Sequence, residues 1–203
     1  MTHSQNKSPL TAQSIAFISM FAALICVCSW IAVPSPFSSG VSFTLQTFGV
    51  ILAGLLLSPL EAFLTGIVYM LLGLVGLPVM SGFGTLYTRF PTAGGGYIIG
   101  FYIAPVLIAL AREAIFAAAD KHAPAEKRAQ VHFVIYLVLS ILLGILAVDI
   151  PGVIQAMHYT KMPLGAAITP FALAFMPTDI VKCILAAAAA SALERPFKMI
   201  RSR

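Results

Sequence analysis

The sequence predicts an all-α integral membrane protein with six transmembrane helices and both termini in the cytoplasm. This prediction rests on the composition, the spacing of the apolar runs and the placement of the basic residues. Of the 203 residues, 60% are hydrophobic and 9% are charged, and the mean hydropathy is +0.97. Soluble domains carry roughly 25% charged residues. This chain therefore has too few charges to cover a water-facing surface and is expected to lie in the cell membrane.

The apolar runs divide the chain into six segments, where a span needs about 20 mostly apolar residues. The predicted spans are, in order, 12–33, 44–57, 60–77, 96–119, 132–148 and 177–193. The second and third spans are short and separated only by Ser58 and Pro59, so they predict a tight helical hairpin. The first run is too long for a cleaved signal peptide, and we interpret it as a retained span.

Basic residues test this topology independently, because cytoplasmic loops carry an excess of Lys and Arg. With six spans, both termini and the loop after the fourth span share one side. That side holds Lys7, Arg112, Lys121, Lys127, Arg128, Arg195, Lys198, Arg201 and Arg203, whereas the other holds only Arg89 and Lys161. We therefore predict a cytoplasmic tail at 1–11, a membrane domain at 12–193 and a basic cytoplasmic tail at 194–203. The last tail is expected to bind anionic lipid rather than nucleic acid.

The long Gly, Pro and aromatic-rich loops all fall on the outer side, where we expect the functional site. Irregular backbone near a membrane persists only where protein or water satisfies it. The segment 164–175 is interrupted and flanked by Pro163, Pro170 and Pro177. It is predicted either to lie along the outer surface or to descend partway as a lid.

The strongest candidate for chemistry is the pair Asp179 and Lys182 at the head of the last span. Residues three apart share a helix face, and Thr178 is the predicted N-cap. Ionisable groups within a span are costly and are functional candidates by default. The alternative is a structural ion pair that holds this helix to its neighbours.

Arg89 is the second candidate, because it lies among Tyr87, Phe90 and Tyr97 in an outer loop. A guanidinium among aromatic rings suits recognition of a carboxylate or a planar group. The alternative is a solvated arginine at the membrane interface. The following run "GGGY" would either present backbone N–H groups at a helix start or let helices pack closely.

The remaining ionisable residues predict no catalytic, metal or cofactor site. Asp149 is expected to end the fifth span as a solvated acid, and Glu61 to complement the dipole of the third span. The histidines show no metal-ligand spacing. In the first span, Ser19, Ala22, Ala23 and Cys26 form small-xxx-small pairs, which favour close helix packing within the chain or docking onto another membrane protein.

Three stretches together resemble the BioY family over positions 41–190. They are "VSFTLQTFGVILAGLLLSPLEAFLTGIVYMLLGLVGLPVMSGFGTL", "PTAGGGYIIGF" and "FMPTDIVKCILA". BioY proteins are the biotin-capture components of energy-coupling factor (ECF) vitamin transporters. The resemblance implies six transmembrane helices, a biotin site near the outer surface, and partner docking through the small residues of the first helix. The implied partners are a transmembrane coupling protein and two ATP-binding subunits, or a second copy of this chain.

Biotin carries a ureido ring with two N–H donors and a carbonyl, and its tail ends in a carboxylate. If the resemblance holds, Asp179 would accept ureido N–H bonds, and Lys182 would donate to the carbonyl or pair with the tail. Arg89 would bind the carboxylate, with Tyr87 and Tyr97 beside it.

Two other functions remain open at this point. The first is an autonomous secondary transporter, for which Asp149 and Asp179 are the candidate acids of a proton relay. The second is a capture protein for another vitamin. An intramembrane enzyme is disfavoured, because the sequence shows no nucleophile, metal or paired-acid constellation.

Overall fold

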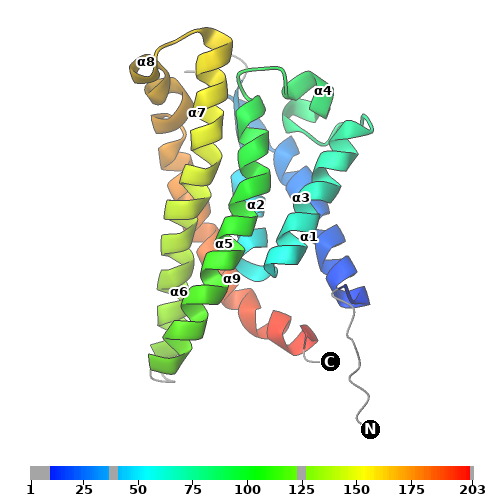
Figure 1. Cartoon of the computed structure of the whole chain (residues 1–203), viewed down its shortest axis with the longest axis vertical. Coiled ribbons are helices and arrows are strands. Elements are labelled where there is room, and N and C mark those ends of the chain that lie inside the picture. The colour runs from blue at the N-terminus through cyan, green and yellow to red at the C-terminus, as the bar shows by residue number, and fades with distance from the viewer. Residues whose placement is uncertain (1–9, 37–40, 123–126, 202–203) are drawn as a thin grey trace.

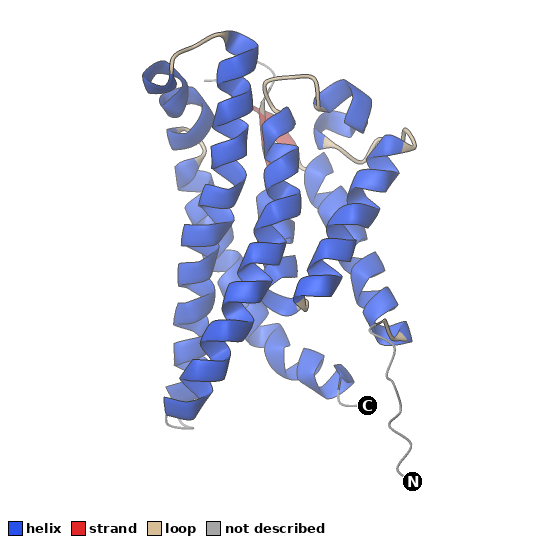
Figure 2. Cartoon of the chain, viewed as in Figure 1, coloured by secondary structure: helices blue, strands red, loops and turns tan. Residues whose placement is uncertain are grey.

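The computed structural model describes residues 10–36, 41–122 and 127–201 and consists almost entirely of helices (Figures 1 and 2). The elements are α1 (Ala12–Trp30), β1 (Ala32–Pro34), β2 (Ser42–Thr44), α2 (Gln46–Leu56), α3 (Pro59–Leu74), η1 (Ser81–Phe83), α4 (Leu86–Arg89), α5 (Gly95–His122), α6 (Arg128–Leu139), the π-helical η3 (Ser140–Ile145), α7 (Leu146–Thr160), α8 (Leu164–Ile168), the π-helical η4 (Thr169–Leu173) and α9 (Met176–Arg201).

The long helices run side by side and define two ends of a bundle (Figure 1). Helix α1 begins and α9 ends at one of them, which we call the terminal end. The opposite end carries α4 and α8 and the short antiparallel pair β1–β2, in which Ala32 lies opposite Thr44. We call it the loop end.

In the described part of the chain, four helices are long and apolar enough to cross a membrane: Ala12–Trp30, Gly95–Ala119, Arg128–Thr160 and Met176–Arg201. Helices α2 and α3 have 11 and 16 residues. At 1.5 Å per residue, α2 is roughly 16 Å long, about half of a hydrocarbon core of about 30 Å. The prediction of a helical protein with several spans is confirmed, but these two elements are shorter than full spans.

Helix α2 lies at the centre of the bundle, where it packs against α1, α5 and α9. Its side chains Val50, Ile51, Ala53 and Leu55 are fully buried. A helix that is apolar on every side is typical of a buried position. The apolar run 44–57 therefore marks a central helix, and its first residues lie at the base of the loop end.

The predicted end of the fifth span at residue 148 is wrong, because the helix continues through Pro151 to Thr160. Pro151 and Gly152 are typical helix-breaking signals, but membrane helices tolerate proline where neighbouring elements satisfy the freed backbone. Here α7 lies in backbone contact with α5. A Cβ atom added at Gly100 would lie 2.5 Å from the Cα atom of Val148.

Helix α9 also extends beyond its predicted bounds. It begins at Met176 rather than after Thr178, whose hydroxyl donates to the carbonyl of Phe175 at 2.8 Å instead of capping the helix. It then passes the predicted boundary at residue 193 and continues to Arg201. Phe197 is buried and stacks on Phe17 of α1, with 4.7 Å between ring centroids. Residues 194–201 are therefore helical and pack on the bundle.

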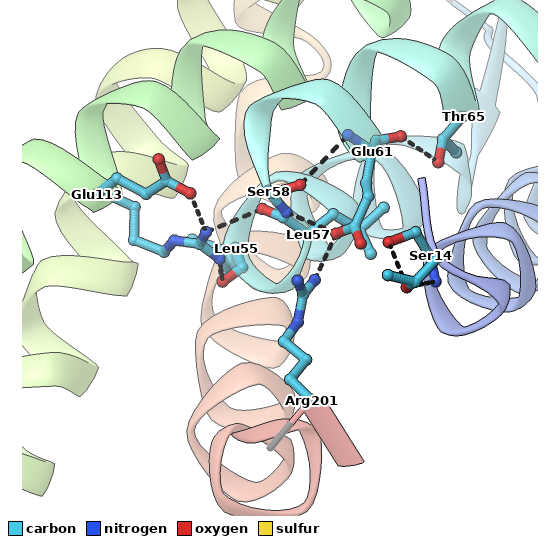
Figure 3. Close-up of polar contacts among 10 residues, drawn as sticks. Ser14, Leu55, Leu57, Ser58, Glu61, Thr65, Glu113 and Arg201 are labelled. Atoms are coloured by element: carbon cyan, nitrogen blue, oxygen red, sulfur yellow. Dashed lines mark hydrogen bonds and ion pairs between the residues drawn. The ribbon is translucent and has the colours of Figure 1, made fainter. Parts of the chain in front are cut away.

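At the terminal end, polar groups fix the turn between α2 and α3 (Figure 3). Ser58 and Glu61 form a capping box, in which the Ser58 amide donates to Glu61 at 2.9 Å. Arg201 binds the same carboxylate, and Arg112 donates to the carbonyl groups of Leu55 and Leu57. Glu61 thus does more than complement a helix dipole, because it joins α3 to the end of α9.

The contact between α5 and α7 gives a stability prediction. Gly100→Ala places a methyl group against the backbone of α7, and overpacking of this kind costs about 1–3 kcal/mol. We expect the Tm in detergent to fall by at least about 2 °C. Gly165→Ala is the matched control, because a Cβ atom there meets nothing within 4 Å. Equal Tm values for the two variants would contradict the proposed close contact.

Candidate functional site

A pocket of about 640 Å³, including its open mouth, lies between the long helices on the loop-end side of α2. Its base is the first turn of α2, and its walls come from segments far apart in the sequence. Its polar and charged lining residues are Ser42, Thr44, Gln46, Thr47, Ser81, Arg89, Thr92, Tyr97, Asp149, Asp179 and Lys182. The N-terminal end of α2, which carries positive dipole charge, therefore faces this space.

Asp179 and Lys182 form an ion pair on the pocket side of α9. Lys182 Nζ lies 2.7 Å from Asp179 Oδ1, and the two residues are 8% and 4% exposed. Thr47 on α2 lies beside Asp179 in the pocket lining. A buried ion pair usually costs more desolvation energy than it returns and is weak evidence for a purely structural role. Its location in the pocket favours ligand contact.

Asp149 is the main correction to the predicted site. It was expected to be a solvated acid at a helix end, but it lies within the continuous helix 128–160, is only 7% exposed and lines the pocket. The pocket therefore holds two acids and two basic residues. Their formal charges sum to zero rather than to the +1 obtained from Asp179, Lys182 and Arg89 alone.

Arg89 lines the pocket from the end of α4. The turn at Gly82 and Gly84 surrounds its side chain: Gly82 has a φ of +62°, and a Cβ atom at Gly84 would lie 2.5 Å from Arg89 Nε. The guanidinium donates only a long bond, 3.4 Å, to the carbonyl of Gly82. Its buried Nε has no partner among the described residues, so this group retains donors for a ligand.

The two predicted tyrosines have different locations. Tyr97 is buried in the pocket wall, and its hydroxyl donates to the carbonyl of Phe171. Tyr87 is 63% exposed and does not line the pocket. The structure thus brings together Asp179, Lys182, Arg89 and Tyr97 but leaves Tyr87 outside.

Several pocket residues were not predicted. Gln46 and Thr47 are polar residues at the start of an apolar run, and this contrast was the available signal. Gln46 Nε2 donates to the hydroxyl of Tyr69 at 2.7 Å. Phe175 forms an apolar wall and packs against Phe43 and Tyr97, with ring centroids 4.5 and 5.9 Å away.

The glycine run and the small residues of α1 serve packing in part. Side chains at Gly95 and Gly96 would collide with the carbonyl groups of Phe90 and Pro151, which agrees with the close-packing interpretation of "GGGY". On α1, Ala22 and Cys26 are buried inside the chain, whereas Ser19 and Ala23 are exposed. Of these four residues, only Ser19 and Ala23 are accessible to a partner.

The pocket is suited to binding a small polar molecule. It offers carboxylate acceptors, ammonium and guanidinium donors, and aromatic walls in a desolvated space, where charge-assisted hydrogen bonds are strong. Among residues 10–36, 41–122 and 127–201, no three His, Cys, Asp or Glu side chains lie close enough to hold a metal ion.

Comparison with known proteins agrees with this geometry. The family model described as the BioY family matches residues 1–199. A probable biotin transporter BioY of Lysinibacillus sphaericus is 34% identical over 190 residues, which is 93% of this chain and 89% of the relative. A probable biotin transporter BioY of Bacillus subtilis is 30% identical and covers 84% of each chain.

The fold also matches a solved structure. The crystal structure of the S-component for biotin from an ECF-type ABC transporter superposes with a TM-score of 0.79 at 25% identity, covering 96% of this chain and 95% of the other. Family model, relatives and fold therefore agree over nearly the whole length, and the chain belongs to the BioY family.

Proposed function

We propose that this chain captures biotin at the pocket and delivers it for uptake across the cell membrane, as the substrate-binding component of an ECF-type transporter. The observation that carries the proposal is the buried Asp179–Lys182 pair in the pocket on the loop-end side of α2. The relatives that match most of the chain are biotin transporters, and the fold is that of an S-component for biotin. The chain is a multi-pass membrane protein and a transport component rather than an enzyme.

The pocket residues have complementary roles toward biotin. Asp179 accepts an N–H bond from the ureido ring, and Lys182 donates to its carbonyl oxygen. Arg89 at the mouth binds the tail carboxylate, while Tyr97 and Phe175 cover the apolar part of the molecule. Capture of a trace vitamin at nanomolar concentration requires about 12 kcal/mol of binding free energy. Several desolvated charge-assisted bonds together with apolar burial can supply this amount.

We further propose that the membrane contains six helical segments and that both termini are cytoplasmic. The support is the excess of Lys and Arg at the terminal end, together with the return of the chain to that end in the α2–α3 hairpin (Figure 1). The loop end and its pocket would then face outward, toward the incoming vitamin.

Labelling with a membrane-impermeant thiol reagent tests this orientation. Lys161 and Lys127 are exposed residues at opposite ends of the bundle, and the three native cysteines are buried. In intact cells we expect Lys161→Cys to be labelled and Lys127→Cys to be protected until the cells are lysed. The reverse pattern would invert the proposed topology.

Docking to ECF partners is proposed for the exposed face of α1. Ser19 and Ala23 would let a partner helix approach closely, whereas the buried Ala22 and Cys26 of the predicted set would not contact it. The proposed assembly contains a transmembrane coupling protein and two ATP-binding subunits, with a homo-oligomer as the alternative.

Uptake that depends on ATP supports this assembly. Uptake that survives ATP depletion but collapses with the proton gradient favours an autonomous secondary transporter.

Equilibrium binding of labelled biotin to the purified chain in detergent, without ATP or partners, tests the function. We expect saturable nanomolar binding, and at least about tenfold weaker binding for Asp179→Asn, because a hydrogen bond to a charged group is worth about 1.5–3 kcal/mol. Glu113→Gln removes an acid from the other end of the bundle and should bind as the native chain does. No binding by a monodisperse native sample would refute biotin capture. Native-like affinity of Asp179→Asn would remove Asp179 from the site.

Arg89 gives a separate prediction, about the biotin tail. Arg89→Ala should lower the affinity for biotin but have little effect on the affinity for biotin carboxamide, which lacks the anionic group. Lys161→Gln removes a positive charge from the same end of the bundle, outside the pocket lining, and controls for long-range attraction. If Arg89→Ala weakens both ligands equally, the arginine does not contact the carboxylate.

A further inference from the structure

The carboxylate of Asp149 is an unusual group within the pocket. The residue is 7% exposed and lines the cavity beside Asp179 and Lys182. Among the described residues, however, no hydrogen bond or ion pair involves its oxygens, whereas Asp179 has Lys182 at 2.7 Å. The oxygens of Asp149 are not fully enclosed and so reach the cavity surface, where a charge without a bonded partner is costly. Its retention in the pocket wall therefore points to a group that arrives from outside the chain.

The backbone holds Asp149 in this position. Gly100 of α5 contacts Val148, and Gly96 contacts Pro151, so residues on either side of Asp149 lie directly against α5. One turn further, Gly152 contacts the ring of Tyr97. A side chain carried by so tightly packed a segment has little freedom to move out toward water.

The basic and amide donors that line the pocket with Asp149 each have an acceptor other than Asp149, although Lys182 and Arg89 keep further N–H groups. Lys182 on α9 is bonded to Asp179, and the Tyr97 hydroxyl on α5 donates to Phe171. On α2, the Gln46 amide donates to Tyr69. Arg89 extends from α4 and donates to Gly82. A ligand N–H group can supply Asp149 with a hydrogen-bond donor inside the cavity.

We propose that Asp149 is a second acceptor for the ligand, so that Asp149 and Asp179 each receive one N–H group of a cyclic urea while Lys182 donates to its carbonyl oxygen. The inference rests on the proposed function and adds that Asp149 helps to determine which ring systems the pocket accepts. The edge of a urea presents donor, acceptor and donor, and the pocket supplies two acceptors and one donor. A ring that lacks either N–H group leaves a buried carboxylate unpaired, a penalty that discriminates strongly between similar ligands.

Two lactam analogues of biotin, each with one ureido N–H replaced by CH₂, test the proposal without adding bulk to the ligand. In the native chain both lactams should bind at least about tenfold more weakly than biotin. In Asp149→Ala, biotin should weaken by a similar factor, and one of the lactams should now bind within about threefold of biotin. The other lactam should still be discriminated against. In Asp179→Ala, the other lactam should be the one that binds nearly as well as biotin. Combining each variant with each lactam gives a double-mutant cycle for each N–H group.

The outcomes separate this inference from the proposed function. Failure of the native chain to bind biotin refutes the function itself. Native binding with unchanged discrimination against both lactams in Asp149→Ala overturns the role of Asp149 alone. The isosteric Asp149→Asn provides a readout of a structural role: without ligand its Tm should equal or exceed that of the native chain, because an unpaired buried charge is removed. A lower Tm with intact lactam discrimination would assign Asp149 to stability instead.

Discussion

The architecture depends on one constraint: the central helix α2 is shorter than the hydrocarbon core of the membrane is thick. Helix α2 is about half as long as a hydrocarbon core is thick, yet α1, α5 and α9 surround it at full length. The space beyond its first turn is neither lipid nor packed protein, and it becomes the pocket. Polar residues such as Gln46 and Thr47 can lie within the depth of the membrane because α2 begins at a cavity rather than in hydrocarbon.

The charges of the pocket follow from the same constraint. An ionisable group at this depth needs compensation, and the formal charges of Asp149, Asp179, Lys182 and Arg89 sum to zero. Asp179 and Lys182 form a direct ion pair, whereas the buried Nε of Arg89 has no partner among the described residues. The site is therefore preorganised on rigid helices but incompletely satisfied. This combination favours tight binding of a ligand with matching donors and acceptors.

Much of this arrangement could be predicted from the sequence. The apolar runs located the helices, and the spacing of Asp179 and Lys182 identified a paired acid and base on one face. Asp149 was misplaced because Pro151 and Gly152 indicate a helix end when read locally, and only packing against Gly96 and Gly100 explains why the helix continues. Tyr87 lies outside the pocket for a related reason: neighbours in sequence at a short helix such as α4 point in different directions. The contact between Arg201 and Glu61 joins residues 140 positions apart and had no local signal.

The position of α9 in the chain order has a consequence for biogenesis. The described pocket takes its residues from the β1–β2 hairpin and α2, from the α4–α5 region, from α7 and finally from α9. Synthesis proceeds from the N-terminus, so Asp149 and Thr47 enter the membrane before Asp179 and Lys182 exist. Until α9 inserts, the α9 side of the pocket is missing, and the polar groups that line the pocket lack their partners on that helix. The nascent chain is thus most exposed to quality-control proteases just before the step that makes it able to bind.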